Sequence, residues 1–452
     1  MKQSSSMPEP DLLAALFGDE QIADVFSDQV LIQRMLEVEA ALAKVQGGLG
    51  IIPAEAAQTI ASTVPNLNVD MDRLREDTIK DGVPVAGLVR QVRKYVGSSS
   101  AIYVHWGATT QDIVDTARLL QIRQVLASLV ELLKVLIGNL ASLANQHRAT
   151  LMAARTHSQQ ALPMPFGLKV ASWLAPLLRH QQRLQEITQR LFVIQFGGAA
   201  GTLASLGDAG IKVQEGLAAE LGLGVPLMPW HAQRDCIAEL SGWLSLVSGN
   251  LAKMAQDVIL MAQTEVGEIA ESGDHGRGGS SSMPQKSNPV ISEMIIVAAR
   301  TNAALLSAMH QALIQEHERG THGWQMEWIS LPQMFTLTAS SLKRAIFLSQ
   351  NLAINSGRMR ANVNASNGLM MAEALHLALA PILGQDEAKT LVTKACQTTL
   401  TKHQHLADVI RDSLKQHRID VALDWGQFQD ETRYFGSSDA FINRVLEQAR
   451  KV

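Results

Sequence analysis

The chain has 452 residues, of which 46% are hydrophobic, and a formal net charge of −4. This is enough apolar material for a large core or several domains, and the charge excludes the strongly basic surface typical of proteins that bind nucleic acid or membranes. The two cysteines, Cys236 and Cys396, cannot form a disulfide framework and follow no metal-ligand spacing, so we expect a cytoplasmic protein. Residues 1–11 are polar and predict no signal peptide.

The first hundred residues predict short helices, and one long helix follows them. Residues 32–47 carry apolar side chains at helical spacing and end at Gly47 and Gly48. A polar turn at residues 103–112 precedes a segment from residue 111 to about 147 that contains no proline and one glycine. As a helix it would be about 55 Å long, at about 1.5 Å per residue. Its apolar residues cover more than one face, so we expect it to be buried between neighbouring helices.

Four further segments are also long, apolar and poor in strand patterns: residues 167–194, 236–269, 292–315 and 331–352. With the first long helix they predict an all-α fold with a central bundle of five long helices. We place an N-terminal helical domain at 1–110, the central bundle and oligomer core at 111–360, and a C-terminal domain of shorter helices at 361–452. Helices with such apolar faces predict oligomerisation.

Two other classes of protein are excluded by the same segments. The most apolar stretch, residues 126–140, contains Glu131 and Lys134 in its middle, which argues against a membrane span. No GxGxxG turn follows a predicted strand, which excludes a dinucleotide-binding fold.

A first candidate for chemistry is the polar turn that precedes the first long helix. It places Thr109 and Thr110 at a helix N-terminus, where hydroxyl groups, free amides and the helix dipole favour an anion. Simple helix capping by Thr110 or Asp112 explains the same residues equally well.

A second candidate is His157, which lies between Arg155 and Gln159 at the end of a long helix. A histidine in such a place transfers protons or is only a hydrogen-bonded structural residue. The third candidate is the segment 278–289, where glycines let the backbone bend, serines supply hydroxyl groups, and Lys286 can hold a carboxylate. By composition alone this segment could equally be a surface linker.

The order of residues in this segment favours a site. Residues 279–289 match Gly-Ser-Ser-x-Met-Pro-x-Lys-x-Asn-Pro, and on this motif the chain resembles the class II fumarase/aspartase superfamily. The resemblance implies a mostly helical homotetramer, with each active site formed by three subunits. It also implies a reaction that adds O–H or N–H across an alkene bearing a carboxylate, or the reverse.

The resemblance assigns roles to particular residues. It implies that Ser280 shuttles a proton at the carbon beside a carboxylate, with positive charge supplied by Lys286. His157 resembles the histidine of the superfamily's Thr-His-x-Gln motif, which transfers a proton or contacts the substrate. Glu293 resembles the glutamate that pairs with this histidine, although an acid in the first turn of a helix also favours the dipole.

Further patterns are similar to those of bacterial 3-carboxy-cis,cis-muconate cycloisomerases. They are Leu16–Asp19, Gly82–Val85, Pro229–Asp235, Thr264–Glu268, Glu316–Gly320, Trp324–Trp328 and Phe435–Ile442. The nearest alternative, adenylosuccinate lyase, has an arginine for nucleotide phosphate where this chain has Trp328, and a histidine that is missing between Asp77 and Asp81. A tryptophan cannot replace a bidentate arginine at a phosphate.

This second resemblance implies closure of a γ-lactone in the catabolism of aromatic compounds, by addition of a substrate carboxylate to a double bond. No metal or redox cofactor is expected for this reaction. The alternatives are a C–N lyase similar to adenylosuccinate lyase and a crystallin-like structural homologue without turnover. The residues that we expect to bind the substrate tricarboxylate are Thr109, Thr110, Gln159, Asn288, Gln233 and Arg319.

Overall fold

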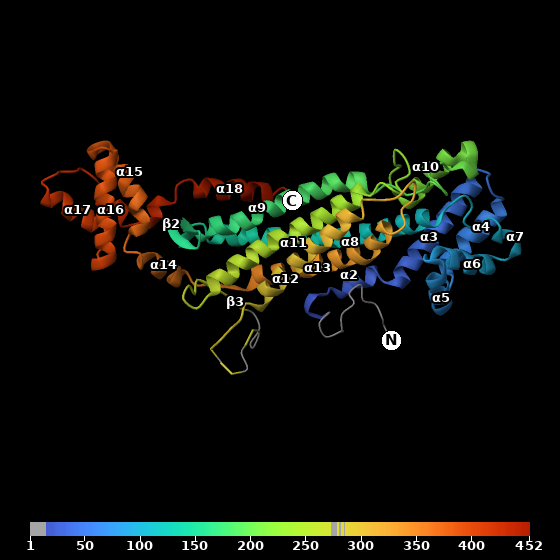
Figure 1. Cartoon of the computed structure of the whole chain (residues 1–452), viewed down its shortest axis with the longest axis horizontal. Helices are drawn as coiled ribbons and strands as arrows, with labels where there is room; N and C mark the ends of the chain where they lie inside the picture. The colour runs from blue at the N-terminus through green and yellow to red at the C-terminus, as the bar shows by residue number, and fades with distance from the viewer. Residues whose placement is uncertain (1–14, 273–277, 280–281, 284) are drawn as a thin grey trace. The chain divides into compact units, whose positions relative to one another are not determined.

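The structure is a computed structural model that describes residues 15–272, 278–279, 282–283 and 285–452. Helices dominate this part of the chain (Figure 1). The strands described there form two antiparallel pairs, β1 (Leu151–Thr156) with β2 (Gln159–Pro165) and β3 (Ile269–Glu271) with β4 (Leu352–Ile354). The all-α prediction is confirmed, with two short strand pairs added to it.

The predicted set of five long helices is confirmed. They are α8 (Thr110–Gln146), α9 (Phe166–Leu191), α11 (Asp235–Ala262), α12 (Val290–Gln311) and α13 (Gly323–Asn351). The prediction starts the last helix at residue 331, but α13 begins eight residues earlier and contains Pro332. A proline removes one backbone hydrogen bond of a helix without always ending it. Leu331, Met334 and Phe335 around it are buried, and their packing supports the helix through this point.

The contacts of the chain group into two compact units. Unit 1 comprises the described part of 1–132 with 180–249 and 297–342, and unit 2 comprises 133–179, 250–296 and 343–452. Each of the five long helices contributes one part to each unit. The three consecutive domains expected from the sequence stay a prediction, although α8 begins at Thr110, beside the first predicted boundary.

Unit 1 contains the N-terminal helices, whose bounds are α2 (Glu20–Val25), α3 (Asp28–Gly48), α4 (Ala54–Thr63), η1 (Val64–Asn66), α5 (Met71–Asp81), α6 (Val85–Val96) and α7 (Ser98–Ala101). It also contains η2 (Ala204–Ala209) and α10 (Gly210–Leu221). Apolar side chains of these helices form one core cluster with the first turns of α8, including Leu36, Leu42, Leu88, Ile113 and Phe196.

Buried polar side chains tie the long helices to one another inside unit 1. Asn302 of α12 donates to Ser248 Oγ of α11 at 3.1 Å and to Thr338 Oγ1 of α13 at 3.0 Å. The indole N–H of Trp243 in α11 donates to the carbonyl of His180 in α9 at 2.8 Å. Such bonds fix the register of neighbouring helices, because a shifted helix would leave a buried polar group without a partner.

Unit 2 ends in shorter helices, as the sequence predicts for this region. They are α14 (Ser356–Asn364), η3 (Leu369–Met371), α15 (Ala372–Leu383), α16 (Gln385–Lys402), α17 (Leu406–Gln416), η4 (Trp425–Phe428), η5 (Glu431–Tyr434) and α18 (Ser438–Ala449). Their core includes the buried side chains of Leu375, Leu379, Leu406, Ile410 and Phe428. This core is separate from the cluster that surrounds the start of α8.

A β-hairpin stands where the sequence analysis expects only a polar turn. Strands β1 and β2 pair with Thr156 opposite Gln159, so the loop contains only His157 and Ser158. The buried residues Leu151 and Ala153 give β1 an inward face. The prediction missed these strands because they are short and β2 contains Pro163 and Pro165, which are unusual inside a sheet.

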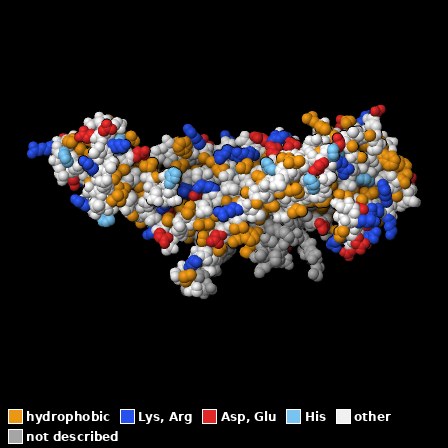
Figure 2. All heavy atoms as spheres, viewed as in Figure 1, with side chains coloured by type: hydrophobic (Ala, Val, Ile, Leu, Met, Phe, Trp, Pro, Cys, Tyr) orange, Lys and Arg blue, Asp and Glu red, His pale blue; other side chains and the backbone are white. Residues whose placement is uncertain are grey.

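Apolar side chains remain exposed along the long helices. Figure 2 shows them interspersed over this part of the surface. They include Val135 of α8, Leu246 of α11, Val297 of α12 and Ile329 of α13, which are 43% to 66% exposed. By length and composition alone α8 and α12 could cross a membrane, a test that the core helices of soluble proteins also pass.

Candidate active site

The N-terminus of α8 is fixed by Asp112. Its Oδ2 accepts a hydrogen bond from the backbone N–H of Thr109 at 3.0 Å, which is the return bond of a capping box. The capping explanation offered by the sequence is therefore confirmed for Asp112. Because Thr109 and Thr110 begin the helix, this bond also sets where their partly buried side chains lie.

Asp112 binds two further segments of unit 1. Its carboxylate accepts the backbone N–H groups of Gly197 at 3.0 Å and Gly198 at 2.9 Å, and it lies 2.8 Å from Nε2 of His231. The Gln195 side chain donates a further bond at 3.1 Å. Asp112 is only 1% exposed, so this buried carboxylate connects the start of α8 to the turn after residue 195 and to the segment around residue 231.

Four of the predicted substrate contacts lie in this region of unit 1. Arg319 donates through Nη1 to the hydroxyl oxygen of Thr109 at 2.6 Å, which joins two residues 210 positions apart in the sequence. Thr110 follows Thr109 in the first turn of α8. Gln233 is exposed and lies between His231 and Arg234, both of which are bound to α8. The region offers a guanidinium group, hydroxyl groups and a helix N-terminus, all of which suit a carboxylate.

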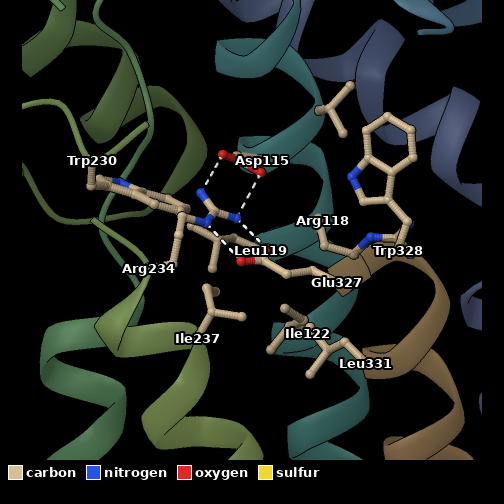
Figure 3. A pocket seen from close by; sticks show the side chains of 11 residues that line it. Asp115, Arg118, Leu119, Ile122, Trp230, Arg234, Ile237, Glu327, Trp328 and Leu331 are labelled. Atoms are coloured by element: carbon tan, nitrogen blue, oxygen red, sulfur yellow. Dashed lines mark hydrogen bonds and ion pairs between the residues drawn. The ribbon is translucent and has the colours of Figure 1, made fainter. Parts of the chain in front are cut away.

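A buried charged cluster surrounds the guanidinium of Arg234 (Figure 3). Arg234 donates to Asp115 Oδ2 at 2.6 Å and Oδ1 at 3.2 Å, and to Glu327 Oε1 at 2.8 Å and to its second oxygen. The indole N–H of Trp324 donates to Asp115 at 2.8 Å, and Arg234 stacks on Trp230 at 4.8 Å. The cluster joins α8 and α13 to the residue that precedes α11, because Asp115, Glu327 and Arg234 come from these three places.

Burial and charge act in opposite directions on these groups. Burial alone would lower the pKa of Arg234, but the carboxylates of Asp115 and Glu327 raise it above its usual value. Burial raises the pKa of Glu327, and Arg234 offsets only part of this effect. Burial lowers the pKa of the neighbouring Arg118 to about 10 despite the opposing charge of Asp115. The guanidinium of Arg234 therefore stays charged and holds both carboxylates.

His105, four residues before Thr109, forms a second buried pair. Its Nδ1 lies 2.6 Å from Oε1 of Glu39, which is 2% exposed. Burial alone would lower the pKa of His105, but the charge of Glu39 and the hydrogen bond to it raise the pKa above its usual value. The fold therefore favours the protonated imidazole, which brings a positive charge close to the predicted anion-binding turn.

The remaining described site residues lie in unit 2. His157 and Gln159 are exposed at the tip of the hairpin formed by β1 and β2. Lys286 is exposed, Asn288 is half-buried, and Glu293 is exposed in the first turn of α12. Ser280 lies outside the described residues. Within a single chain neither His157 nor Glu293 hydrogen bonds to the other in the part that the structure describes, so their pairing stays a prediction.

The segment before α12 is held at its base by Glu271. The two oxygens of its carboxylate accept the backbone N–H groups of Ile291 at 3.0 Å and Ser292 at 2.8 Å. The two ends of the segment 278–289 also meet, because the N–H of Asn288 donates to the carbonyl of Gly278 at 2.8 Å. A Cβ atom on Gly278 would lie 2.3 Å from the carbonyl oxygen of Asn288, so only glycine fits at this position.

The sequence analysis missed the buried acids that hold these segments. Asp115 and Glu327 lie inside apolar helical patterns, and a lone carboxylate on an apolar face is a signal that a buried cationic partner exists. The sequence does not say which cation this is. Arg234 and Glu327 each lie in a recognised pattern, but Arg234 is 119 residues from Asp115 and 93 residues from Glu327.

We predict that Arg234→Met strongly destabilises the protein. It leaves Asp115 and Glu327 buried without their cation, which costs about 3–5 kcal/mol of unfolding free energy. The matched control is a triple variant that adds Asp115→Asn and Glu327→Gln, which should recover most of the loss because neither carboxylate is then left buried without the guanidinium. Chemical unfolding followed by circular dichroism measures both. An Arg234→Met protein that unfolds like the wild type would contradict the assignment.

We also predict a pH-dependent contribution from His105. Because its folded pKa is raised, the stabilisation is fully present below the unfolded value of about 6.5 and is lost as the pH rises through the folded pKa. The free energy of unfolding should therefore fall as the pH rises above about 6.5, and fall less in His105→Asn, which tolerates the positive φ of 64° at this position. If the free energy of unfolding falls equally with pH in both proteins, the pairing of His105 with Glu39 is refuted.

Comparisons with known proteins show to which family the chain belongs. A model of the lyase family matches residues 18–301. The chain is 39% identical to the 3-carboxy-cis,cis-muconate cycloisomerase of Acinetobacter baylyi over 97% of this chain and 98% of that protein. It is 40% identical to trans-aconitate decarboxylase 1 of Mycosarcoma maydis over 96% of this chain and 88% of that protein.

The solved structures give the same result. The crystal structure of the 3-carboxy-cis,cis-muconate lactonizing enzyme from Pseudomonas putida superposes with a TM-score of 0.92 at 36% identity, covering 98% of this chain and 99% of that one. Sequence and fold thus match over nearly the whole length of these relatives. The chain therefore belongs to the lyase family of the class II fumarase/aspartase superfamily, together with the 3-carboxy-cis,cis-muconate cycloisomerases.

Proposed function

We propose that the chain is a cycloisomerase that converts 3-carboxy-cis,cis-muconate to 4-carboxymuconolactone, in the protocatechuate branch of the β-ketoadipate pathway. The observation that carries the proposal is the match to cycloisomerases of this name at 38–39% identity over nearly the whole chain. The charged cluster supports it, because it is built from Pro229–Asp235 and Trp324–Trp328, two of the segments on which the resemblance to these enzymes rests.

The protein takes little part in the covalent chemistry of this reaction. One substrate carboxylate forms a C–O bond to an alkene carbon, and a proton adds to the neighbouring carbon beside another carboxylate, so no atom is lost. The nucleophile is already ionised at neutral pH and no electron is transferred, so no metal or redox cofactor is needed. Holding the two reacting groups in line can itself remove about 7–11 kcal/mol from the barrier.

The protein must therefore neutralise and orient a tricarboxylate. In unit 1 the guanidinium of Arg319 with Thr109, Thr110 and Gln233 would hold one carboxylate, and the 2.6 Å bond between Arg319 and Thr109 supports a common binding region. In unit 2 the other contacts would come from Gln159, Lys286 and Asn288. Ser280 and His157 would handle the proton, with Glu293 as the partner of His157.

We further propose a cytoplasmic homotetramer whose sites are shared between subunits. The exposed apolar residues on α8, α11, α12 and α13 support contacts between copies of the chain, because large apolar faces are stable in water only when covered. Shared sites would also bring His157 and Glu293 of different copies together. The two unpaired cysteines agree with a reducing compartment.

A second candidate function is decarboxylation of trans-aconitate. The relative from Mycosarcoma maydis with that name is as similar to this chain as the cycloisomerases are. Both names describe unsaturated tricarboxylates, so one arrangement of cationic and hydroxyl groups could bind either substrate. The two reactions differ in outcome, because decarboxylation releases carbon dioxide whereas lactonisation releases nothing.

We predict that the purified protein, without added metal, removes the ultraviolet absorbance of the conjugated diene in 3-carboxy-cis,cis-muconate. Parallel reactions contain trans-aconitate, with carbon dioxide as the readout, and adenylosuccinate, with fumarate as the readout. Turnover of the first alone supports the cycloisomerase. Carbon dioxide release without lactone formation would replace it by the decarboxylase, and cleavage of adenylosuccinate would mean that the chain is a C–N lyase. No turnover of any of them would favour a non-catalytic homologue.

We predict that Ser280→Ala and His157→Ala each lower kcat by about 10²–10⁴-fold, the usual contribution of a proton-transfer group, without lowering the unfolding temperature. The two inactive proteins can then be dissociated, mixed and reassembled. If sites are shared, mixed tetramers regain activity, because some sites take Ser280 from a His157→Ala copy and His157 from a Ser280→Ala copy. Mixed tetramers confirmed by mass spectrometry that stay inactive would contradict shared sites.

A further inference from the structure

The tip of the β1–β2 hairpin holds His157 in an unusual backbone conformation. His157 and Ser158 have φ values of 48° and 63°, and they are the two central residues between the paired Thr156 and Gln159. Two-residue turns of this type prefer Asn-Gly or Gly-Gly, since both positions need a positive φ. A histidine and a serine there are strained, which points to a function for the side chains.

The nearest strong anchor of this tip is Arg155, two residues before His157. Its guanidinium binds Glu268 through two parallel bonds, Nη1 to Oε2 at 2.8 Å and Nη2 to Oε1 at 2.7 Å. The strand pairing shifts between Ala153 and Arg155, and such an irregularity changes the direction of the side chain that follows. Glu268 is 0% exposed, so this is a buried bidentate pair on an otherwise exposed hairpin end.

Glu268 is itself held by hydrogen bonds to its side chain and to its backbone. Its Oε1 also accepts a bond from Asn362 Nδ2 at 2.9 Å. Its backbone N–H donates to the carbonyl of Met261 at the end of α11, at 3.0 Å, and its carbonyl accepts the N–H of Asn355 at 2.9 Å. Asn362 additionally accepts a bond from Gln160 of β2 at 3.4 Å. Both strands of the hairpin are therefore tied to one fixed point between α11 and α14.

We propose that Glu268 is a positioning residue, which sets the place and direction of His157 through Arg155. The inference rests on the proposed function in one respect, namely that His157 acts on the substrate. In the described residues the side chains of His157 and Ser158 make no hydrogen bond within the chain, so the tip depends on what holds its base. If the strands below the turn were loosely held, the imidazole would move away from the reacting carbon. A displacement of about 1 Å can cost about 10²-fold in rate.

The test compares three variants. Glu268→Gln removes the charge behind Arg155, and the double variant Arg155→Gln with Glu268→Gln removes both charges. Glu239→Gln is the matched control, because Glu239 forms a bidentate pair with Arg190 on the exposed surface of α9 and α11. The readouts are kcat and KM, the unfolding temperature, and hydrogen–deuterium exchange of peptides that cover residues 151–165.

We expect Glu268→Gln to lower kcat by about 10- to 100-fold and to raise KM much less, because Gln159 is the one proposed substrate contact on this hairpin and the other contacts lie elsewhere. The double variant should regain the unfolding temperature, since no unpaired charge is buried, but keep the low kcat. Exchange of the hairpin should rise in both variants and stay at the wild-type level in Glu239→Gln.

Two outcomes would overturn the proposal. If kcat recovers together with the unfolding temperature in the double variant, the pair only stabilises the fold. If hairpin exchange in Glu268→Gln equals that of the wild type, Glu268 does not hold the turn, whatever the substrate is. Wild-type protein that turns over none of the three candidate substrates refutes the proposed function instead, and the exchange result still decides whether Glu268 is the anchor.

Discussion

The predicted anion-binding region of unit 1 depends on two buried carboxylates, Asp112 and Asp115, in the first turns of α8. They are three residues apart, so they lie on neighbouring positions of one helix face. Asp112 gathers backbone and side-chain donors from the turn after residue 195 and from His231, and Asp115 gathers Arg234 and Trp324. A buried carboxylate is costly unless all its acceptor sites are filled, which forces these distant segments to meet at the start of α8.

The same arrangement recurs in unit 2. Exposed groups with a proposed chemical role, such as His157, stand at the ends of short irregular segments, and each segment is fixed from behind by a buried or half-buried acid. Glu268 holds the hairpin through Arg155, and Glu271 holds the start of α12, which carries Glu293. The proposed function therefore makes these acids the support of the site and leaves the groups that face solvent to contact the substrate. A rigid support of this kind reduces the cost of orientation during the reaction.

The named relatives have a class of substrate in common more than a single reaction. Cycloisomerases and a trans-aconitate decarboxylase match the chain about equally well, and both names describe unsaturated tricarboxylates. Binding such a substrate requires several cationic or hydrogen-bonding groups around one cavity. The choice between proton delivery during lactonisation and loss of carbon dioxide then depends on how the reacting carbon is placed, which few residues control.

The sequence by itself determined the helical class, the five long helices and the motif at residues 279–289, because helical periodicity and a contiguous motif are local properties of the chain. It also predicted Thr109 and Arg319 as candidates, but their contact follows only from the fold. The hairpin under His157 was not predicted, since its strands are short and β2 contains two prolines. Only the tertiary structure decided which acid meets which cation, as in Arg234 with Asp115 and Glu327 or Arg155 with Glu268, because such pairs join residues about a hundred positions apart and leave no periodic trace in the sequence.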